Sequence, residues 1–141
     1  MAKLGKAFGM RVTGIRRNPQ DDEHADEVLG LDRFEELLPM TDYLVLSLPD
    51  SSETRDIINA DVLEKLNSYA MLINVGRGTA INEDDLSEAL NDGKIAAAAL
   101  DTTKVEPLDV NSSLWTSKNC FISAHDSAHS LLYLEIGRAH V

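Results

Sequence analysis

The sequence is short of cysteine and of long apolar segments. Its one cysteine, Cys120, leaves no partner for an internal disulfide among the 141 residues and excludes a cysteine cage for a metal. The longest uninterrupted apolar run, residues 95–100, has six residues, so we expect no transmembrane helix. No apolar core follows Lys3 and Lys6, which argues against a signal peptide. Together these absences predict a cytoplasmic protein, and the length of 141 residues predicts one domain of ordinary size.

Basic side chains are scarce after residue 17. The net charge is −11; residues 1–17 hold five basic side chains and no acid, so the remainder has 8 basic and 24 acidic residues. Such an acidic body argues against nucleic acid or an anionic membrane as a partner. The short basic stretch at the start still suits a small anion.

Short apolar runs alternate with amphipathic helical segments, a rhythm typical of βαβ units. The pattern predicts an α/β protein with a doubly wound parallel sheet and no linker long enough to divide domains. We expect strands at residues 10–15, 42–48, 70–75, 94–100 and 119–123. The run 42–48 is apolar enough to be buried on both faces.

Helix ends are signalled by capping residues. Asp32 and Glu35 have the spacing of a capping box, and the helix that they open should stop near Pro39. Asn59 and Asn82 are expected to cap two later helices. The second of these helices should end in a left-handed residue at Gly93.

Polar residues directly follow three successive predicted strands. They are Arg77, then Asp101 with Glu106, then His125. Because ligands of parallel α/β sheets bind beyond the carboxyl ends of the strands, we expect these side chains to converge on one crevice. Arg77 lies between two glycines and suits a carboxylate, whereas His125 is a general acid–base that titrates near neutrality. A carboxylate beside the imidazole favours its charged form and fixes its tautomer.

Each of these residues also has a purely structural interpretation. A glycine-flanked arginine can be a turn residue, a single histidine is usually not catalytic, and Glu106 with Pro107 fits a solvated loop. His125 and His129 are four residues apart, but only Asp126 lies nearby as a third ligand, so we expect no metal site. Cys120 is expected to be a small buried hydrophobe.

Seven short motifs occur in an order that is similar to one enzyme family. They are residues 8–12 (FGMRV), 46–49 (LSLP), 53–54 (ET), 74–78 (NVGRG), 99–101 (ALD), 106–108 (EPL) and 123–125 (SAH). Over residues 2–130 the chain resembles the nucleotide-binding domain of the D-isomer-specific 2-hydroxyacid dehydrogenases. This group includes phosphoglycerate dehydrogenase and glyoxylate/hydroxypyruvate reductase. The resemblance implies a Rossmann-like fold.

The resemblance also implies a reaction and a role for each matched residue. Hydride would pass between the nicotinamide C4 and the C2 of a small 2-oxo or 2-hydroxy acid. Arg77 would hold the substrate carboxylate, His125 would exchange the proton, and Glu106 would keep His125 protonated for reduction. Asp101 would meet the nicotinamide carboxamide. The adenosine and pyrophosphate side would be lined by Leu48, Pro49, Thr54, Val75 and Gly76.

The chain departs from the family pattern at its start. The first strand and the glycine-rich turn are missing, so we expect a partial dinucleotide-binding domain over residues 1–130 that is inactive by itself. The strands at 10–15 and 42–48 would then be exposed edges. Residues 131–141 form a tail, of which 136–141 resemble read-through of a sequencing adapter. The family's substrate domain is absent as well, and the full-length protein would be a homodimer.

The cofactor and the function class each have two interpretations. Arg16 stands where NAD-preferring members carry an acid, and Arg17 follows, so we expect NADP rather than NAD; the alternative is a surface turn. The leading function is an oxidoreductase domain acting on glyoxylate or hydroxypyruvate. The alternative is a non-catalytic nucleotide-sensing or protein-interaction module on the same fold. The trio of Arg77, Glu106 and His125 favours the enzyme, because a binding module has no need of it.

Overall fold

The computed structural model describes residues 1–128. The chain divides into two compact units, Met1–Pro39 and Met40–Val141. No helix within the described residues combines the length and the apolar character needed to cross a membrane.

The first unit contains a two-stranded parallel sheet. After α1 (Ala2–Ala7), β1 (Thr13–Ile15) pairs with β2 (Glu27–Leu29). The carboxylate of Asp26 holds the start of β2, because it accepts the Val12 N–H at 2.7 Å and forms an ion pair with Lys6. The sequence does not signal β2, since three residues that begin with a glutamate have no strand pattern of their own.

The helical segment after β2 corrects one predicted cap. Three short pieces follow one another: η1 (Leu31–Arg33), α2 (Phe34–Leu37) and η2 (Leu38–Met40). The predicted capping box is wrong. Asp32 already lies inside η1, and Arg33, the N-cap residue of α2, makes no side-chain capping bond. The α-helix does stop before Pro39, as its sequence predicts.

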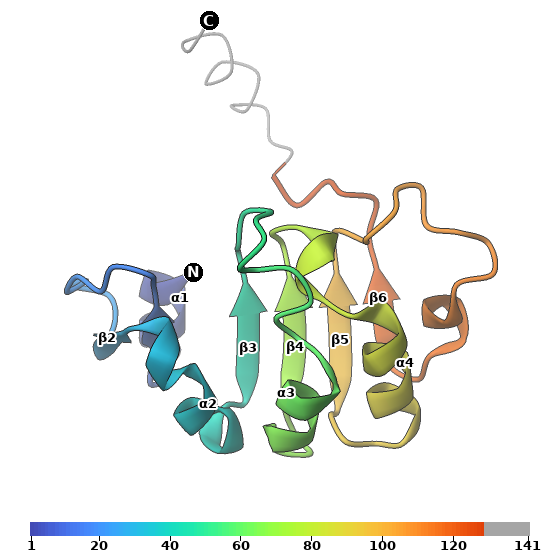
Figure 1. The fold of residues 1–141 in the computed structure, drawn as a ribbon. Coiled ribbons are helices and arrows are strands. Elements are labelled where there is room, and N and C mark those ends of the chain that lie inside the picture. The colour runs from blue at the N-terminus through green and yellow to red at the C-terminus, as the bar shows by residue number, and fades with distance from the viewer. Residues whose placement is uncertain (129–141) are drawn as a thin grey trace, which may run out of the picture. The chain divides into compact units, whose positions relative to one another are not determined.

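The second unit is built on a four-stranded parallel sheet with the order β3-β4-β5-β6. The strands are β3 (Tyr43–Leu46), β4 (Met71–Asn74), β5 (Ala97–Leu100) and β6 (Cys120–Ile122). Between them lie α3 (Ala60–Lys65), η3 (Gly78–Ala80), α4 (Glu83–Asn91) and η4 (Ser113–Thr116). Figure 1 shows α3 and α4 on the same face of this sheet. The predicted parallel α/β architecture is confirmed.

Local signals set the ends of the two helices in this unit. The Asn59 Oδ1 accepts the Val62 N–H at 3.2 Å and caps α3. The Asn82 Oδ1 accepts the Asp85 N–H at 3.3 Å and caps α4. Gly93 follows α4 with a φ of +73°, the left-handed conformation that glycine adopts without strain. All three predictions are confirmed.

The core lies between the helices and the sheet. Side chains of β4 and β5 alternate between buried and half-buried, and Leu72 and Leu100 are almost wholly inaccessible. The prediction that residues 42–48 form a strand buried on both faces is wrong. Tyr43 is 52% and Val45 38% exposed, whereas Leu46 is buried. β3 is the edge strand of the four-stranded sheet, where side chains are covered less, so the expectation that residues 42–48 form an exposed edge is confirmed.

Candidate active site

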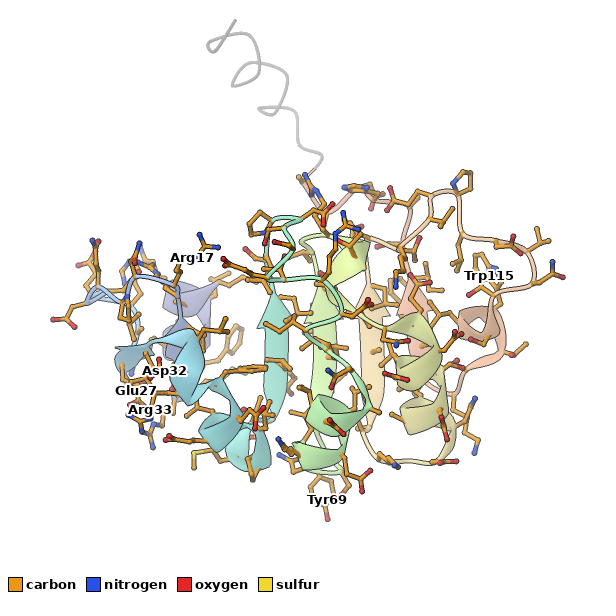
Figure 2. All side chains as sticks on the ribbon, viewed as in Figure 1. Arg17, Glu27, Asp32, Arg33, Tyr69 and Trp115 are labelled. Atoms are coloured by element: carbon orange, nitrogen blue, oxygen red, sulfur yellow. The ribbon has the colours of Figure 1, made fainter. Side chains whose placement is uncertain are left out.

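The four strands of the second unit are parallel, so their carboxyl ends meet at one edge (the arrowheads in Figure 1). A cavity of about 170 Å³ lies at this edge. It is lined by Asp50, Arg77, Gly78, Thr79, Thr102, Thr103, Lys104, Glu106 and His125. The structure thus brings together Arg77, Glu106 and His125, the three residues that the sequence predicts to be catalytic. The labelled ring of Tyr69 projects from the opposite edge (Figure 2).

A buried asparagine shapes the turn that carries Arg77. The Asn74 side chain is inaccessible; its Oδ1 accepts the Gly76 N–H at 3.0 Å and its Nδ2 donates to the Arg77 carbonyl at 3.0 Å. The guanidinium of Arg77 is exposed and donates to the Gly76 carbonyl at 2.8 Å. The sequence gives Asn74 no role, although an amide that ends an apolar strand is a usable signal for a turn of this kind.

The two glycines beside Arg77 allow segments of the chain's own backbone to approach each other. A Cβ on Gly76 would lie 2.6 Å from the Leu48 nitrogen, and one on Gly78 would lie 2.0 Å from the Thr103 carbonyl carbon. Since neither neighbour is a flexible side chain, only glycine fits at both positions. The loops after β3, β4 and β5 are therefore packed backbone against backbone around Arg77.

Glu106 and His125 form a hydrogen-bonded pair. The His125 Nδ1 lies 2.8 Å from the Glu106 Oε2, and the Glu106 Oε1 accepts the Thr103 N–H at 3.2 Å. The hydrogen bond from His125 lowers the pKa of Glu106, with help from the Thr103 amide and from the charge of Arg77, while partial burial opposes the shift. A charged carboxylate at this place selects the tautomer with a proton on Nδ1. His125 Nε2 is then the ring nitrogen that can reach a ligand in the cavity.

Asp101 lies beneath the loop that carries His125 and is not part of the cavity lining. Its carboxylate accepts the Ser123 hydroxyl at 2.7 Å and the N–H groups of Asp126 and Ser127, each at 3.0 Å. Burial of Asp101 opposes ionisation, but the hydrogen bonds from Ser123, Ser127 and Asp126 outweigh it and hold the pKa of Asp101 well below its ordinary value. Its predicted contact with a nicotinamide carboxamide stays a prediction.

The cavity is also lined by residues that the sequence did not single out. Asp50 accepts the Thr79 hydroxyl at 3.0 Å and pairs with Arg55. The Thr102 hydroxyl is buried and has no hydrogen-bond partner within residues 1–128, so it can take up a polar ligand group. Lys104 pairs with Asp56. These cavity residues also follow strand ends, which is the sequence signal that identified Arg77, so the same signal could have found them.

The residues predicted to bind the cofactor are distributed over both units. Five of them lie on segments that follow β3 and β4, namely Leu48, Pro49, Thr54, Val75 and Gly76. The Thr54 hydroxyl donates to the Pro49 carbonyl at 2.7 Å and accepts the Ser51 N–H at 3.0 Å, so it also shapes its own loop.

Arg16 and Arg17 belong to the first unit and follow β1 directly; Figure 2 labels Arg17. The Arg16 guanidinium pairs with the Asp22 carboxylate at 3.1 Å, and the backbone N–H of Arg16 donates to the Leu29 carbonyl at 3.0 Å. An anion bound by Arg16 would therefore have to compete with Asp22. Both side chains of the Arg16–Asp22 ion pair are substantially exposed. His129, half of the histidine pair that the sequence argues is not a metal site, lies outside the described residues.

Comparisons of the sequence with known proteins point to one enzyme family. Residues 1–127 match the sequence model of the D-isomer specific 2-hydroxyacid dehydrogenase, NAD binding domain. Glyoxylate reductase/hydroxypyruvate reductase from Homo sapiens is 38% identical over 126 residues, which cover 89% of this chain and 38% of that protein. Glyoxylate reductase from Aeropyrum pernix is 38% identical over 127 residues, which cover 89% of this chain and 37% of that one. The chain therefore spans less than half the length of these curated relatives.

Solved structures show the same relationship. A D-isomer specific 2-hydroxyacid dehydrogenase family protein from Aeromonas salmonicida matches with a TM-score of 0.89 and 38% identity, covering 97% of this chain and 45% of that one. The NADPH-dependent glyoxylate/hydroxypyruvate reductase from Sinorhizobium meliloti, in complex with NADP and sulfate, matches with a TM-score of 0.85 and 31% identity, covering 97% and 46%. The Rossmann-like fold expected from the motifs is thereby confirmed. This chain belongs to the D-isomer specific 2-hydroxyacid dehydrogenase family, and the part that matches is the NAD binding domain.

Proposed function

We propose that the protein expressed from the complete gene is an oxidoreductase that transfers a hydride between NADPH and a small 2-oxo acid, such as glyoxylate or hydroxypyruvate. One observation carries this proposal. In a single cavity the His125–Glu106 pair, at 2.8 Å, lies with Arg77, whose guanidinium makes no ion pair with any described residue. An unpaired cation beside a histidine–carboxylate pair suits a substrate that has both a carboxylate and a carbonyl.

The residues divide the work of binding and proton transfer. Arg77 holds the substrate carboxylate through two parallel hydrogen bonds, for which a guanidinium has the right shape. His125 donates a proton from Nε2 to the C2 oxygen during reduction and takes it back during oxidation. Glu106 accepts the Nδ1 proton, orients the ring and stabilises the imidazolium. When bound, the nicotinamide supplies the hydride to C2, so that the 2-oxo acid becomes a 2-hydroxy acid.

Three features of the chain support binding of a nicotinamide dinucleotide. The buried Thr102 hydroxyl at the cavity offers a hydrogen-bonding group without a described partner. The cavity that Arg77 lines lies at the sheet edge where ligands of this architecture bind. Arg16 and Arg17 directly follow β1, and two cations there favour the 2′-phosphate of NADP, which would displace Asp22 from Arg16. The Sinorhizobium meliloti relative is described as NADPH-dependent.

The test of this function is oxidation of NADPH by the protein expressed from its complete gene, with glyoxylate, hydroxypyruvate and pyruvate as substrates. We expect turnover with at least one 2-oxo acid. Absence of turnover with all three rejects the enzyme in favour of a module that only binds. By the family resemblance we also expect a homodimer, which light scattering on the purified protein measures.

The role of His125 is tested by His125→Ala with a matched histidine control. Loss of the general acid should lower kcat about 10²- to 10⁴-fold while the dissociation constant for NADPH changes little. His24→Ala is the control, because His24 also lies beside a glutamate, Glu23 at 3.5 Å, but belongs to the first unit and does not line the cavity. It should leave kcat unchanged. Equal losses of NADPH binding and turnover in His125→Ala would make His125 a structural residue.

A further inference from the structure

We propose that Asp101 is a positioning residue: its buried carboxylate anchors the loop after β6 on both sides of His125 and so aims the imidazole at Glu106. The catalytic consequence rests on the function proposed above. The structural part of the inference, that Asp101 determines the conformation of His125, does not.

The contacts of Asp101 surround His125 along the chain. The Oδ1 accepts the Ser123 hydroxyl at 2.7 Å, two residues before His125, and the Asp126 N–H at 3.0 Å, one residue after it. The Oδ2 accepts the Ser127 N–H at 3.0 Å. Asp101 itself is 5% exposed and lies at the end of β5, next to the sheet. One buried carboxylate therefore accepts hydrogen bonds from the loop both before and after the histidine.

The loop needs such an anchor because His125 has an unfavourable backbone conformation. Its φ is +57°, in the left-handed region that residues other than glycine seldom adopt. A residue keeps this conformation only where the surroundings impose it. Residues 124–128 are exposed and bury little that could do so. The hydrogen bond from the Ser123 N–H to the Leu100 carbonyl, at 2.9 Å, fixes the start of the loop, and Asp101 fixes the part beyond it.

The position of the ring follows from the backbone. With φ at +57°, the His125 Nδ1 reaches the Glu106 Oε2 at 2.8 Å. If φ relaxed to the ordinary negative region, the side chain would leave Glu106 and the Nδ1–H tautomer would lose its acceptor. Asp101 thus acts on the proton-transfer group through the backbone, without touching the cavity.

The same contacts distinguish an anchoring role of Asp101 from a role in binding the cofactor directly. A carboxylate accepts about four hydrogen bonds, and three groups of the chain already donate to Asp101. A carboxamide would have to reach a group that is 5% exposed. Anchoring acts on the protein before any cofactor binds, whereas a carboxamide contact appears only with the cofactor present. The two roles are therefore distinguished by measuring the protein alone.

The experiment is NMR on this chain without cofactor, comparing the wild type with Asp101→Asn. The amide keeps one acceptor oxygen and replaces the other by a donor, so at least one loop N–H loses its partner. We expect hydrogen exchange at the Asp126 and Ser127 amides to rise about tenfold or more, since hydrogen bonds to a charged acceptor are strong. Long-range proton–nitrogen spectra should show His125 losing its Nδ1–H preference. His24 provides the internal reference in the same spectra.

Two further measurements keep the result interpretable. If the amide of the core residue Leu86 also loses its protection from hydrogen exchange in Asp101→Asn, this variant has unfolded. The Ser123→Ala variant then tests the proposal in its place. This variant removes one contact of the same anchor and should speed exchange at Asp126 several-fold. In the protein from the complete gene, Asp101→Asn should lower kcat about 10²-fold and leave the NADPH dissociation constant within about twofold, as expected for a misplaced catalytic group.

The outcomes are distinct. Wild-type exchange and an unchanged His125 tautomer in the folded variants overturn the proposal. If hydrogen exchange and the His125 tautomer are unchanged but the Asp101→Asn variant binds NADPH more weakly, Asp101 is a cofactor contact instead. A wild-type protein without turnover defeats the proposed function but leaves the NMR result, and with it the anchoring role, to stand by itself.

Discussion

Gly78→Ala tests whether backbone packing between neighbouring loops holds the site together. A Cβ at this position would lie 2.0 Å from the Thr103 carbonyl carbon and 2.1 Å from its oxygen, whereas ordinary contact begins at 3.4 Å. The two segments must therefore move apart by more than 1 Å. Because backbone cannot rotate away, we expect the free energy of unfolding to fall by about 3 kcal/mol, the upper end of the usual cost of overpacking.

The same displacement should impair the site. The Thr103 N–H donates to Glu106, and Gly78 adjoins Arg77, so a shift between them separates the Arg77 guanidinium from the histidine–carboxylate pair. A misplacement of about 1 Å costs on the order of 10²-fold in rate. We therefore expect kcat/KM for the preferred 2-oxo acid to fall by about that factor in the protein from the complete gene.

Urea unfolding followed by circular dichroism and by the fluorescence of the single tryptophan, Trp115, measures the first effect; steady-state kinetics measures the second. Gly93→Ala is the matched control. Gly93 has a φ of +73°, but a Cβ added to it would meet no atom within 4 Å, and it does not line the cavity. It should cost about 1 kcal/mol of backbone strain and leave kcat/KM unchanged. Wild-type stability and activity in Gly78→Ala would refute the packing argument.

Three further predictions address the helix cap, the cofactor and acid stability. Asn82→Ala should lower the free energy of unfolding by about 1 kcal/mol in urea, because the Asp85 N–H loses its cap, whereas Asn82→Ser should recover most of it. Arg16→Asp should move the ratio of kcat/KM values from NADPH toward NADH; an unchanged ratio contradicts the assignment of the 2′-phosphate. The pKa of Asp101 is lowered in the folded protein, so its stabilisation is complete above the ordinary pKa of an aspartate and is lost as the pH falls below it. The urea concentration at the unfolding midpoint should therefore decrease as the pH is lowered from 5 to 3, about the range in which unfolded aspartates titrate. This decrease should be less steep in Asp101→Asn.

Elements with a local signal could be predicted from the sequence. Asn59 and Asn82 cap their helices because the capping oxygen and the N–H that it accepts are three residues apart, and Gly93 ends its helix through its own backbone freedom. Elements that depend on distant partners could not. β2 has three residues and exists through its pairing with β1 and the contact of Asp26 with Val12. Such contacts leave no periodic pattern in the segment itself.

By itself the sequence determined the alternation of strands and helices, the family, and the order in which Arg77, Glu106 and His125 follow strand ends. The tertiary structure decided which of the polar residues share a cavity. It placed Asp101 under the histidine loop and showed that the glycines beside Arg77 make room for neighbouring backbone. The physical reason is the range of the forces involved. Helix caps and strand propensities act within a few residues, whereas the distance between two loops is set by the register of the strands beneath them.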